Sequence, residues 1–214
     1  MKNGAYFASN GRLGNQLSAL FHAYAEYPNL ENLYFPHMEE YQEYFKCDKF
    51  RDEAFYNNFK EYFHEIDWHN LKDYGNVLRF ADFHLRDEHQ KKVDEMVAQL
   101  GTGDLVAVHI RHGDYKEWCN GEFYFNEMEY LEAANKAVRS WGLRNPKIVI
   151  FSDEKRDVEN FSWSITGGDA VYDMFVMSHF NYFVRTYSTF SGLASHISKC
   201  RGRFKGESQI PRKG

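Results

Sequence analysis

The stretch that decides the fold is Leu105-Val106-Ala107-Val108-His109-Ile110-Arg111-His112-Gly113-Asp114, in the middle of the chain. Its first four residues form an apolar run typical of a strand that is buried on both faces. The strand passes directly into a basic turn that contains a glycine. In parallel sheets ligands bind beyond the carboxyl ends of the strands, where an arginine can grip anionic oxygens through paired N–H groups. We therefore expect Arg111 to face an anionic ligand at the edge of a parallel sheet.

Two further segments place this strand in a larger α/β arrangement. Gly11-Arg12-Leu13-Gly14-Asn15-Gln16 follows a short expected strand, Ala5–Ala8, and precedes a segment with helical spacing. The apolar residues of that helix recur at i, i+3, i+4 and i+7: Leu17, Leu20, Phe21 and Tyr24. Ser188-Thr189-Phe190-Ser191 lies between an aromatic strand and another helix. Both segments are thus expected at the start of a helix that follows a strand.

The second half of the chain alternates between strands and helices, which is typical of a doubly wound parallel sheet. We expect, in chain order, a helix at 87–100, a strand at 105–110, a helix at 127–141, a strand at 148–151, a short helix after Asp153, a helix at 172–180, a strand at 182–186 and a helix at 190–198. Asn126 and Glu129 predict a capping box at the helix that follows them. Residues 28–86 show no clear period, and there we expect helices and loops.

The glycines of Gly101-Thr102-Gly103 end the helix before them and mark the expected boundary between two lobes. The sequence thus predicts an N-terminal lobe at 1–103, a C-terminal lobe at 104–200 and a basic tail at 201–214. The tail holds five Lys or Arg residues against Glu207 alone, and we expect it to be a solvated end.

Charge and composition exclude several classes of function. The formal net charge of −5 argues against a nucleic-acid partner bound through phosphate neutralisation. Three widely spaced cysteines without a C-x-x-C pair indicate neither a disulfide framework nor a zinc site. No apolar run approaches the roughly 18 residues needed to span a bilayer, and Met1–Gly4 does not begin a signal peptide, so we expect a cytoplasmic protein. The aromatic content of 18% suggests surfaces for stacking sugars or bases in addition to the core.

Several short motifs occur in a fixed order along the chain. Gly11–Gln16 has the form Gly-x-x-Gly-Asn-Gln, and His109–Asp114 has the form His-x-Arg-His-x-Asp. Ile148–Asp153 follows, and then Asp173–Ser178 with Ser188–Ser191. Together these motifs resemble the superfamily of GDP-fucose-dependent α1,2-, α1,6- and protein O-fucosyltransferases, whose motif after the central strand is His-x-Arg-Arg-x-Asp.

The resemblance implies a GT-B-like α/β fold with two Rossmann-type lobes, of which the N-terminal one is reduced. It implies that the C-terminal lobe holds a GDP-sugar donor and that a glycan acceptor enters between the lobes. The implied reaction is an inverting, metal-independent transfer of a sugar, fucose in this superfamily, from the GDP-sugar to a saccharide hydroxyl. A bacterial or viral source fits the expected cytoplasmic location.

The resemblance also implies roles for donor-binding residues of the C-terminal lobe. Arg111 would bind the β-phosphate and stabilise the charge of the departing diphosphate. His109 and Asp153 would address the guanine or the ribose. Ser188-Thr189-Phe190-Ser191 would donate hydrogen bonds to the phosphates and pack the base, as suits a helix N-terminus. The structural alternatives are an Arg111–Asp114 surface ion pair and serines that only cap a helix.

In the N-terminal lobe, the resemblance implies that Asn15 and Arg12 contact the donor sugar or the leaving oxygen. Gly11 and Gly14 would let the turn approach the donor, or would serve only a tight turn. The general base is open: Asp114 qualifies if it is not paired with Arg111, and Glu26 and Asp67 are the other candidates.

His112 stands where the superfamily commonly has a second arginine, and its charge depends on pH near neutrality. We therefore expect a weaker second phosphate contact. No Asp-x-Asp pair occurs, Glu65–Asp67 and Glu127–Glu129 being the nearest approximations, and the spacings of His64, His69, His84 and His89 match no metal site. We expect the arginine to replace a metal. Two alternatives stay open: a non-catalytic GDP-sugar- or glycan-binding module, and an unrelated α/β transferase that grips another anionic donor.

Overall fold

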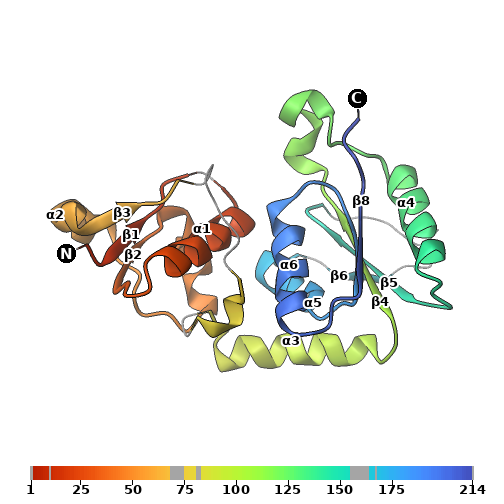
Figure 1. Ribbon diagram of the computed structural model, residues 1–214, viewed down its shortest axis with the longest axis horizontal. Helices are drawn as coiled ribbons and strands as arrows, with labels where there is room; N and C mark the ends of the chain where they lie inside the picture. The colour runs from red at the N-terminus through yellow and green to blue at the C-terminus, as the bar shows by residue number, and fades with distance from the viewer. Residues whose placement is uncertain are drawn as a thin grey trace. The chain divides into compact units, whose positions relative to one another are not determined.

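A computed structural model describes residues 2–9, 11–67, 75–80, 83–154, 164–166 and 168–213. The chain divides into two compact units, Met1–Gln90 and Lys91–Gly214. Each unit contains a parallel β-sheet with helices packed on it (Figure 1). The α/β class expected from the sequence is confirmed. The lobe boundary expected at Gly103 lies beyond the C-terminal end of α3 (Asp87–Leu100), and the division between the units lies near its start.

The N-terminal unit is built around a short parallel sheet. β1 (Gly4–Tyr6) pairs with β2 (Asn32–Tyr34) on one side and with β3 (Phe63–Glu65) on the other. Helix α1 (Leu13–Glu26) buries nearly all of its first three turns. The strands β2 and β3 contradict the expectation of helices and loops alone at 28–86. Strands of three residues are too short to show the alternation from which a strand is recognised.

Shorter helical segments complete this unit. They are the α-helix α2 (Glu53–Phe59) and the 3₁₀ segments η1 (Pro36–Tyr44), η2 (Lys60–Tyr62) and η4 (Val77–Arg79).

The C-terminal unit contains a larger parallel sheet with the order β6-β5-β4-β7-β8. Its strands are β4 (Leu105–Ile110), β5 (Lys147–Ser152), β6 (Ser164–Thr166), β7 (Tyr182–Arg185) and β8 (Gly206–Gln209). β4 lies at the centre, and all six of its residues are buried. The apolar run that opened the sequence analysis is therefore the core strand of this unit.

The helices of this unit cover both faces of its sheet. The chain moves one way across the sheet from β4 to β6 and the other way from β6 to β8. Because parallel crossovers are right-handed, this reversal places α4 (Glu127–Ser140) on one face and both α5 (Ala170–Met177) and α6 (Thr189–Cys200) on the other. Figure 1 shows this arrangement. The reversal lies between β4 and β7, so the crevice expected for a ligand is beyond their carboxyl ends.

Local sequence signals explain the helix boundaries. The Asn126 side chain accepts a hydrogen bond from the Glu129 backbone, and the Glu129 side chain accepts one from the Asn126 backbone, so the predicted capping box is confirmed. Gly101 and Gly103 both have positive φ after α3, as the expected helix stop requires. The short helix predicted after Asp153 falls largely on residues outside the described part of the chain.

The C-terminal segment contradicts the expectation of a solvated end, because Gly206–Gln209 forms the edge strand β8 parallel to β7. The strand is polar and gives no hydrophobic pattern, which is why the sequence did not reveal it. Its backbone pairs along β7, and its Glu207 carboxylate meets the Arg185 guanidinium at 2.7 Å. Ile210, directly after the strand, is buried in the core on the α4 side.

We predict that Ile197→Ala in α6 lowers the free energy of unfolding by about 2–5 kcal/mol, because Ile197 has no exposed surface and its truncation leaves a cavity. Urea unfolding followed by circular dichroism measures this loss. The control Lys136→Ala, an exposed substitution on α4, should stay within about 0.5 kcal/mol of wild type. Equal effects of the two substitutions would contradict the assigned packing of α6.

Candidate functional site

Arg111 lies in the turn that follows the central strand β4, and its side chain is only 14% exposed. Two carboxylates hold its guanidinium: Asp114 Oδ1 lies 2.7 Å from Nη2, and Asp153 Oδ2 lies 3.3 Å from Nη1. The Arg111 backbone N–H donates to the Tyr130 hydroxyl at 3.2 Å. The predicted cation is thus fixed in position at the carboxyl edge of the sheet.

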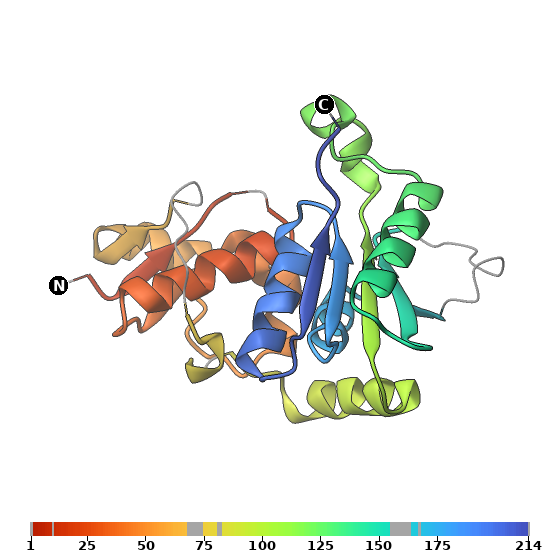
Figure 2. The same cartoon turned by 45° about the vertical axis from the view of Figure 1, so that its right-hand side comes forward.

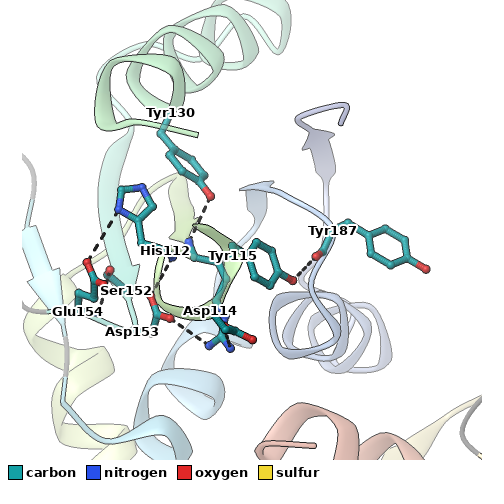
Figure 3. A network of polar contacts seen from close by, with 9 residues as sticks. His112, Asp114, Tyr115, Tyr130, Ser152, Asp153, Glu154 and Tyr187 are labelled. Carbon is teal, nitrogen blue, oxygen red and sulfur yellow. Dashed lines mark hydrogen bonds and ion pairs between the residues drawn. The ribbon is translucent and has the colours of Figure 1, made fainter. Parts of the chain in front are cut away.

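Asp153 follows β5 and connects two parts of this turn. One carboxylate oxygen accepts the His112 backbone N–H at 3.1 Å, and the other faces the Arg111 guanidinium (Figure 3). A single side chain therefore orients both the backbone of the turn and its cation. The structure places Asp153 beside Arg111, whereas the resemblance implied that Asp153 contacts the guanine or the ribose.

Asp114, in contrast, is an exposed partner of Arg111, with 54% of its side chain accessible. The condition under which it would serve as general base, that it is not paired with Arg111, is not met in this structure. Because Asp114 is solvated, its exchange for an anionic ligand costs less than the loss of a buried partner would.

His112 is buried, and its ring is occupied by neighbouring protein groups. Nε2 lies within hydrogen-bonding distance of the Phe125 carbonyl oxygen, and Nδ1 lies 3.9 Å from Glu154. Tyr124 and Tyr130 pack against the ring. The side chain of His112 therefore anchors the turn against the start of α4.

His109 is buried near the end of β4, opposite Phe151 of β5 and Arg185 of β7. Its ring stacks on Phe190 with centroids 5.2 Å apart. Burial and the neighbouring Arg111 lower the pKa of His109 to about 3, so the imidazole is neutral at physiological pH. A neutral imidazole has one donor and one acceptor nitrogen, and Nδ1 has no hydrogen-bond partner in the described part of the chain.

The turn between β7 and α6 holds more buried polar atoms of this kind. Within the described residues, Arg185 Nε, Thr186 Oγ1 and Ser191 Oγ also lack a hydrogen-bond partner. An unsatisfied buried polar group costs about 1–3 kcal/mol, and such groups are rare in native proteins unless a ligand or water completes them. Ser191 lies in the first turn of α6 and His109 stacks on Phe190 of the same turn, so these atoms lie near a helix N-terminus, which attracts anions through its free N–H groups.

The remaining residues of the predicted Ser188–Ser191 segment lie at this helix start. Ser188 is the N-cap residue, but its side chain makes no capping hydrogen bond. Thr189 is exposed, and Phe190 is half-buried against His109. The structure therefore brings together Arg111, the Ser188–Ser191 turn and His109 at one edge of one sheet.

Asp173 is a titratable residue at this edge that the sequence analysis quoted only within a motif and did not assign. It lies in the first turn of α5, a helix that contacts α6, and helix N-termini in parallel units lie at the carboxyl ends of the strands. Burial and, secondarily, Asp169 raise the pKa of the Asp173 carboxyl to about 7. The signal that could have found it is a charged residue in an otherwise apolar helix.

Tyr115 links the two turns. Its hydroxyl donates to the Tyr187 carbonyl, directly before the start of α6 (Figure 3). Burial raises the pKa of Tyr115 to about 12, so the hydroxyl keeps its proton and this link persists at physiological pH.

The predicted N-terminal residues form a turn of their own in the other unit. Arg12 is the N-cap of α1, and Asn15 lies in the first turn of that helix. A side chain at Gly11 would place its Cβ 2.3 Å from Asn15 Cβ, so this position requires glycine. Gly14 is buried in α1, and the buried Gln16 amide donates to Gly11 O at 2.8 Å.

The other acidic candidates of this unit are exposed. Glu26 pairs with His22 at 2.8 Å, and Asp67 follows β3. Across the described residues of both units, no group of three His, Cys, Asp or Glu side chains could hold a metal ion. None of the described helices is long and apolar enough to cross a membrane.

The fold defines an α/β protein of the GT-B kind, with Arg111 and the start of α6 at the carboxyl edge of its larger sheet. The model of glycosyl transferase family 11 matches residues 13–202. The chain therefore belongs to glycosyl transferase family 11 and is a glycosyltransferase, which confirms the resemblance drawn from the sequence motifs.

Solved structures with the same fold are distant in sequence. POFUT1 in complex with GDP-fucose matches with a TM-score of 0.61 and 13% identity over 98% of each chain. Fucosyltransferase NodZ from Bradyrhizobium matches with a TM-score of 0.60 and 13% identity over 91% of this chain and 92% of NodZ. No curated protein matches the chain significantly. These likenesses confirm the GT-B-like fold.

We predict that Asp173→Asn changes how stability depends on pH. The folded-state pKa of about 7 is above the ordinary value of 3.8, so the wild-type carboxyl contributes stability below about pH 4 and loses it as pH rises to about 7. Relative to wild type, the variant should gain free energy of unfolding between pH 4 and 7, by at most about 1.4 kcal/mol per pH unit. Urea unfolding at several pH values measures the difference. The control is Glu132→Gln, an exposed carboxyl on α4. A difference independent of pH would contradict the buried setting of Asp173.

Proposed function

We propose that this glycosyltransferase moves fucose from GDP-fucose to a hydroxyl of a saccharide acceptor, with inversion at the anomeric carbon and without a metal ion. The observation that carries the proposal is Arg111, a guanidinium held at the carboxyl end of the central strand beside the switch in strand order. Family membership supports glycosyl transfer, and structural neighbours include complexes with GDP-fucose and with GDP.

The chemistry of transfer explains the need for this cation. As the glycosidic bond to the β-phosphate breaks, the diphosphate gains negative charge and the anomeric carbon becomes oxocarbenium-like. The acceptor hydroxyl attacks from the face opposite the leaving group and forms the new C–O bond, which inverts the configuration, and its proton passes to water. A preorganised donor at the leaving oxygen stabilises this transition state more than the ground state.

In the proposed donor complex, Arg111 exchanges its exposed partner for the β-phosphate. Asp114 leaves the guanidinium, and Asp153 keeps it oriented. The N–H groups at the start of α6 add hydrogen bonds to the diphosphate. Arg111 thereby supplies the charge that a divalent cation supplies in other transferases.

The nucleoside would use the buried polar atoms at the same edge. His109 Nδ1, Thr186 Oγ1 and Ser191 Oγ would gain the partners that they lack among the described residues. Guanine carries adjacent N1–H and N2–H donors, which match a carboxylate such as Asp173. From the N-terminal unit, Asn15 and Arg12 remain proposed contributors to the donor sugar and leaving oxygen.

We predict that Arg111→Ala abolishes the GDP-dependent rise in melting temperature while the protein stays folded. In wild type, GDP should raise the melting temperature more than UDP, ADP or CDP. Where turnover remains measurable, the variant should lose about a hundred- to a thousandfold in kcat, because it removes a transition-state donor. Arg139→Ala, an exposed arginine in the last turn of α4, is the matched control. An unaltered GDP shift in Arg111→Ala would overturn the assignment.

We predict that EDTA leaves the release of GDP from GDP-fucose unchanged in the presence of a saccharide acceptor. The measurement is coupled GDP detection, with NMR of the product to assign its anomeric configuration. Loss of activity in EDTA that Mg²⁺ or Mn²⁺ restores would contradict the metal-independent part of the proposal.

A non-catalytic GDP-sugar-binding module is the second candidate, and one observation favours it. His112 stands at the position of the second superfamily arginine, and its ring is occupied by Phe125 and Glu154. This candidate predicts GDP binding without GDP release from GDP-fucose, whichever saccharide is added.

A further inference from the structure

Four aromatic side chains form a continuous cluster next to the Arg111 turn. Tyr115 belongs to the 3₁₀ segment η5 (Gly113–Lys116) and Trp118 to η6 (Trp118–Gly121), while Phe123 and Tyr187 lie in the following loop and before α6. Tyr115 stacks on Trp118 with centroids 4.9 Å apart, Trp118 lies 4.8 Å from Phe123, and Phe123 lies 5.7 Å from Tyr187. We call these four residues the aromatic shelf.

The shelf is open to solvent at two of its rings. Trp118 is 40% exposed and Tyr187 is 59% exposed. Neither ring is needed to fill the core of the C-terminal unit, whose buried cluster on the α4 side includes none of the four shelf residues. Exposed aromatic rings joined into one cluster form a candidate interaction surface.

The shelf begins at the proposed phosphate-binding cation. The Arg111 guanidinium lies over the Tyr115 ring, 5.4 Å from its centroid. The Tyr115 hydroxyl is bound to the Tyr187 carbonyl, so the shelf bridges the turns after β4 and before α6 (Figure 3). A group bound on the shelf therefore lies next to the β-phosphate, where the sugar is transferred.

The segment that carries Trp118 is held in a fixed conformation. Cys119 and Asn120 have φ values of 48° and 54°, a left-handed conformation that costs free energy outside glycine. From the C-terminal end, the Lys213 backbone N–H donates to Glu122 O at 2.8 Å, and its ammonium meets Glu129 at 2.8 Å. Figure 2 shows the C-terminus beside this segment. These contacts tie the segment to the rest of the unit, which limits the entropy lost when a ligand binds.

We propose that the aromatic shelf binds a pyranose ring of the saccharide acceptor, with the apolar C–H face of the sugar stacked on Trp118. A pyranose suits this surface because it presents C–H groups on one face and hydroxyls around its rim. The inference rests on the proposed function, since it assigns the acceptor side of the same transfer. The Tyr115 hydroxyl donates its proton to the Tyr187 carbonyl, so this ring contributes its position beside Trp118 and no free donor for a base edge.

The test compares Trp118→Ala and Trp118→Phe with wild type. Saturation-transfer NMR with lactose, cellobiose and chitobiose, each in the presence of GDP, measures binding of free saccharides. For the disaccharide that binds wild type, Trp118→Ala should weaken affinity about tenfold, and Trp118→Phe should weaken it less because a ring remains. The acceptor KM should rise by the same factor, with kcat at saturating acceptor little changed.

Met128→Ala is the control variant. It removes another exposed apolar side chain of the same unit, 54% exposed on α4, and should change neither the disaccharide affinity nor the acceptor KM.

The GDP thermal shift separates failure of the shelf from failure of the proposed function. An absent GDP shift in wild type would overturn the proposed donor. With the GDP shift intact, three results would overturn the shelf: no disaccharide signal in wild type, equal disaccharide affinity in Trp118→Ala, or a reduced GDP affinity in that variant, which would assign the shelf to the donor. Conversion of a wild-type dimer to a monomer by Trp118→Ala in sedimentation would instead identify the shelf as an interface between copies.

Discussion

The site depends on the interaction between the Arg111 guanidinium and the Asp153 carboxylate at the carboxyl edge of the larger sheet. Because Asp153 also accepts the His112 backbone N–H, the same carboxylate sets the path of the turn and the direction of its cation. An arginine side chain without such a partner would occupy many rotamers and would lose side-chain entropy when it binds a phosphate. The ion pair removes this cost before the donor arrives.

The fold brings the other parts of the site to this ion pair. The strand order reverses between β4 and β7, so the turn after β4 and the N-terminus of α6 lie at the edge of the sheet where a ligand crevice is expected. His109 and Arg185 are paired across these two strands, and Phe190 covers the histidine ring. Residues more than half the C-terminal unit apart in sequence thereby meet at one edge, which is a property of the topology and not of any single motif.

The sequence predicted those parts of the molecule whose signals are local. The apolar run of β4 and the Asn126–Glu129 capping box each depend on residues a few positions apart, and both were confirmed. β8 was missed because an edge strand is held by backbone pairing and one ion pair, neither of which leaves an apolar pattern. The pairing of Asp153 with Arg111 and the burial of Asp173 arise only when distant strands and helices pack together. No spacing rule within one segment can predict such contacts.

The free C-terminal unit stores unfavourable free energy where the donor is proposed to bind. His109 Nδ1, Thr186 Oγ1 and Ser191 Oγ lack hydrogen-bond partners within the described residues, and Asp173 is a carboxyl in an environment that opposes its ionisation. Packing elsewhere, around the buried strand β4, offsets this cost. A nucleotide that supplies hydrogen-bond partners to these atoms of β4, of the turn after β7 and of α6 would gain free energy on binding. These buried polar atoms also favour a base whose polar groups match them. A mismatched base would leave the buried atoms without hydrogen bonds and would still exclude water from them, so it would bind more weakly.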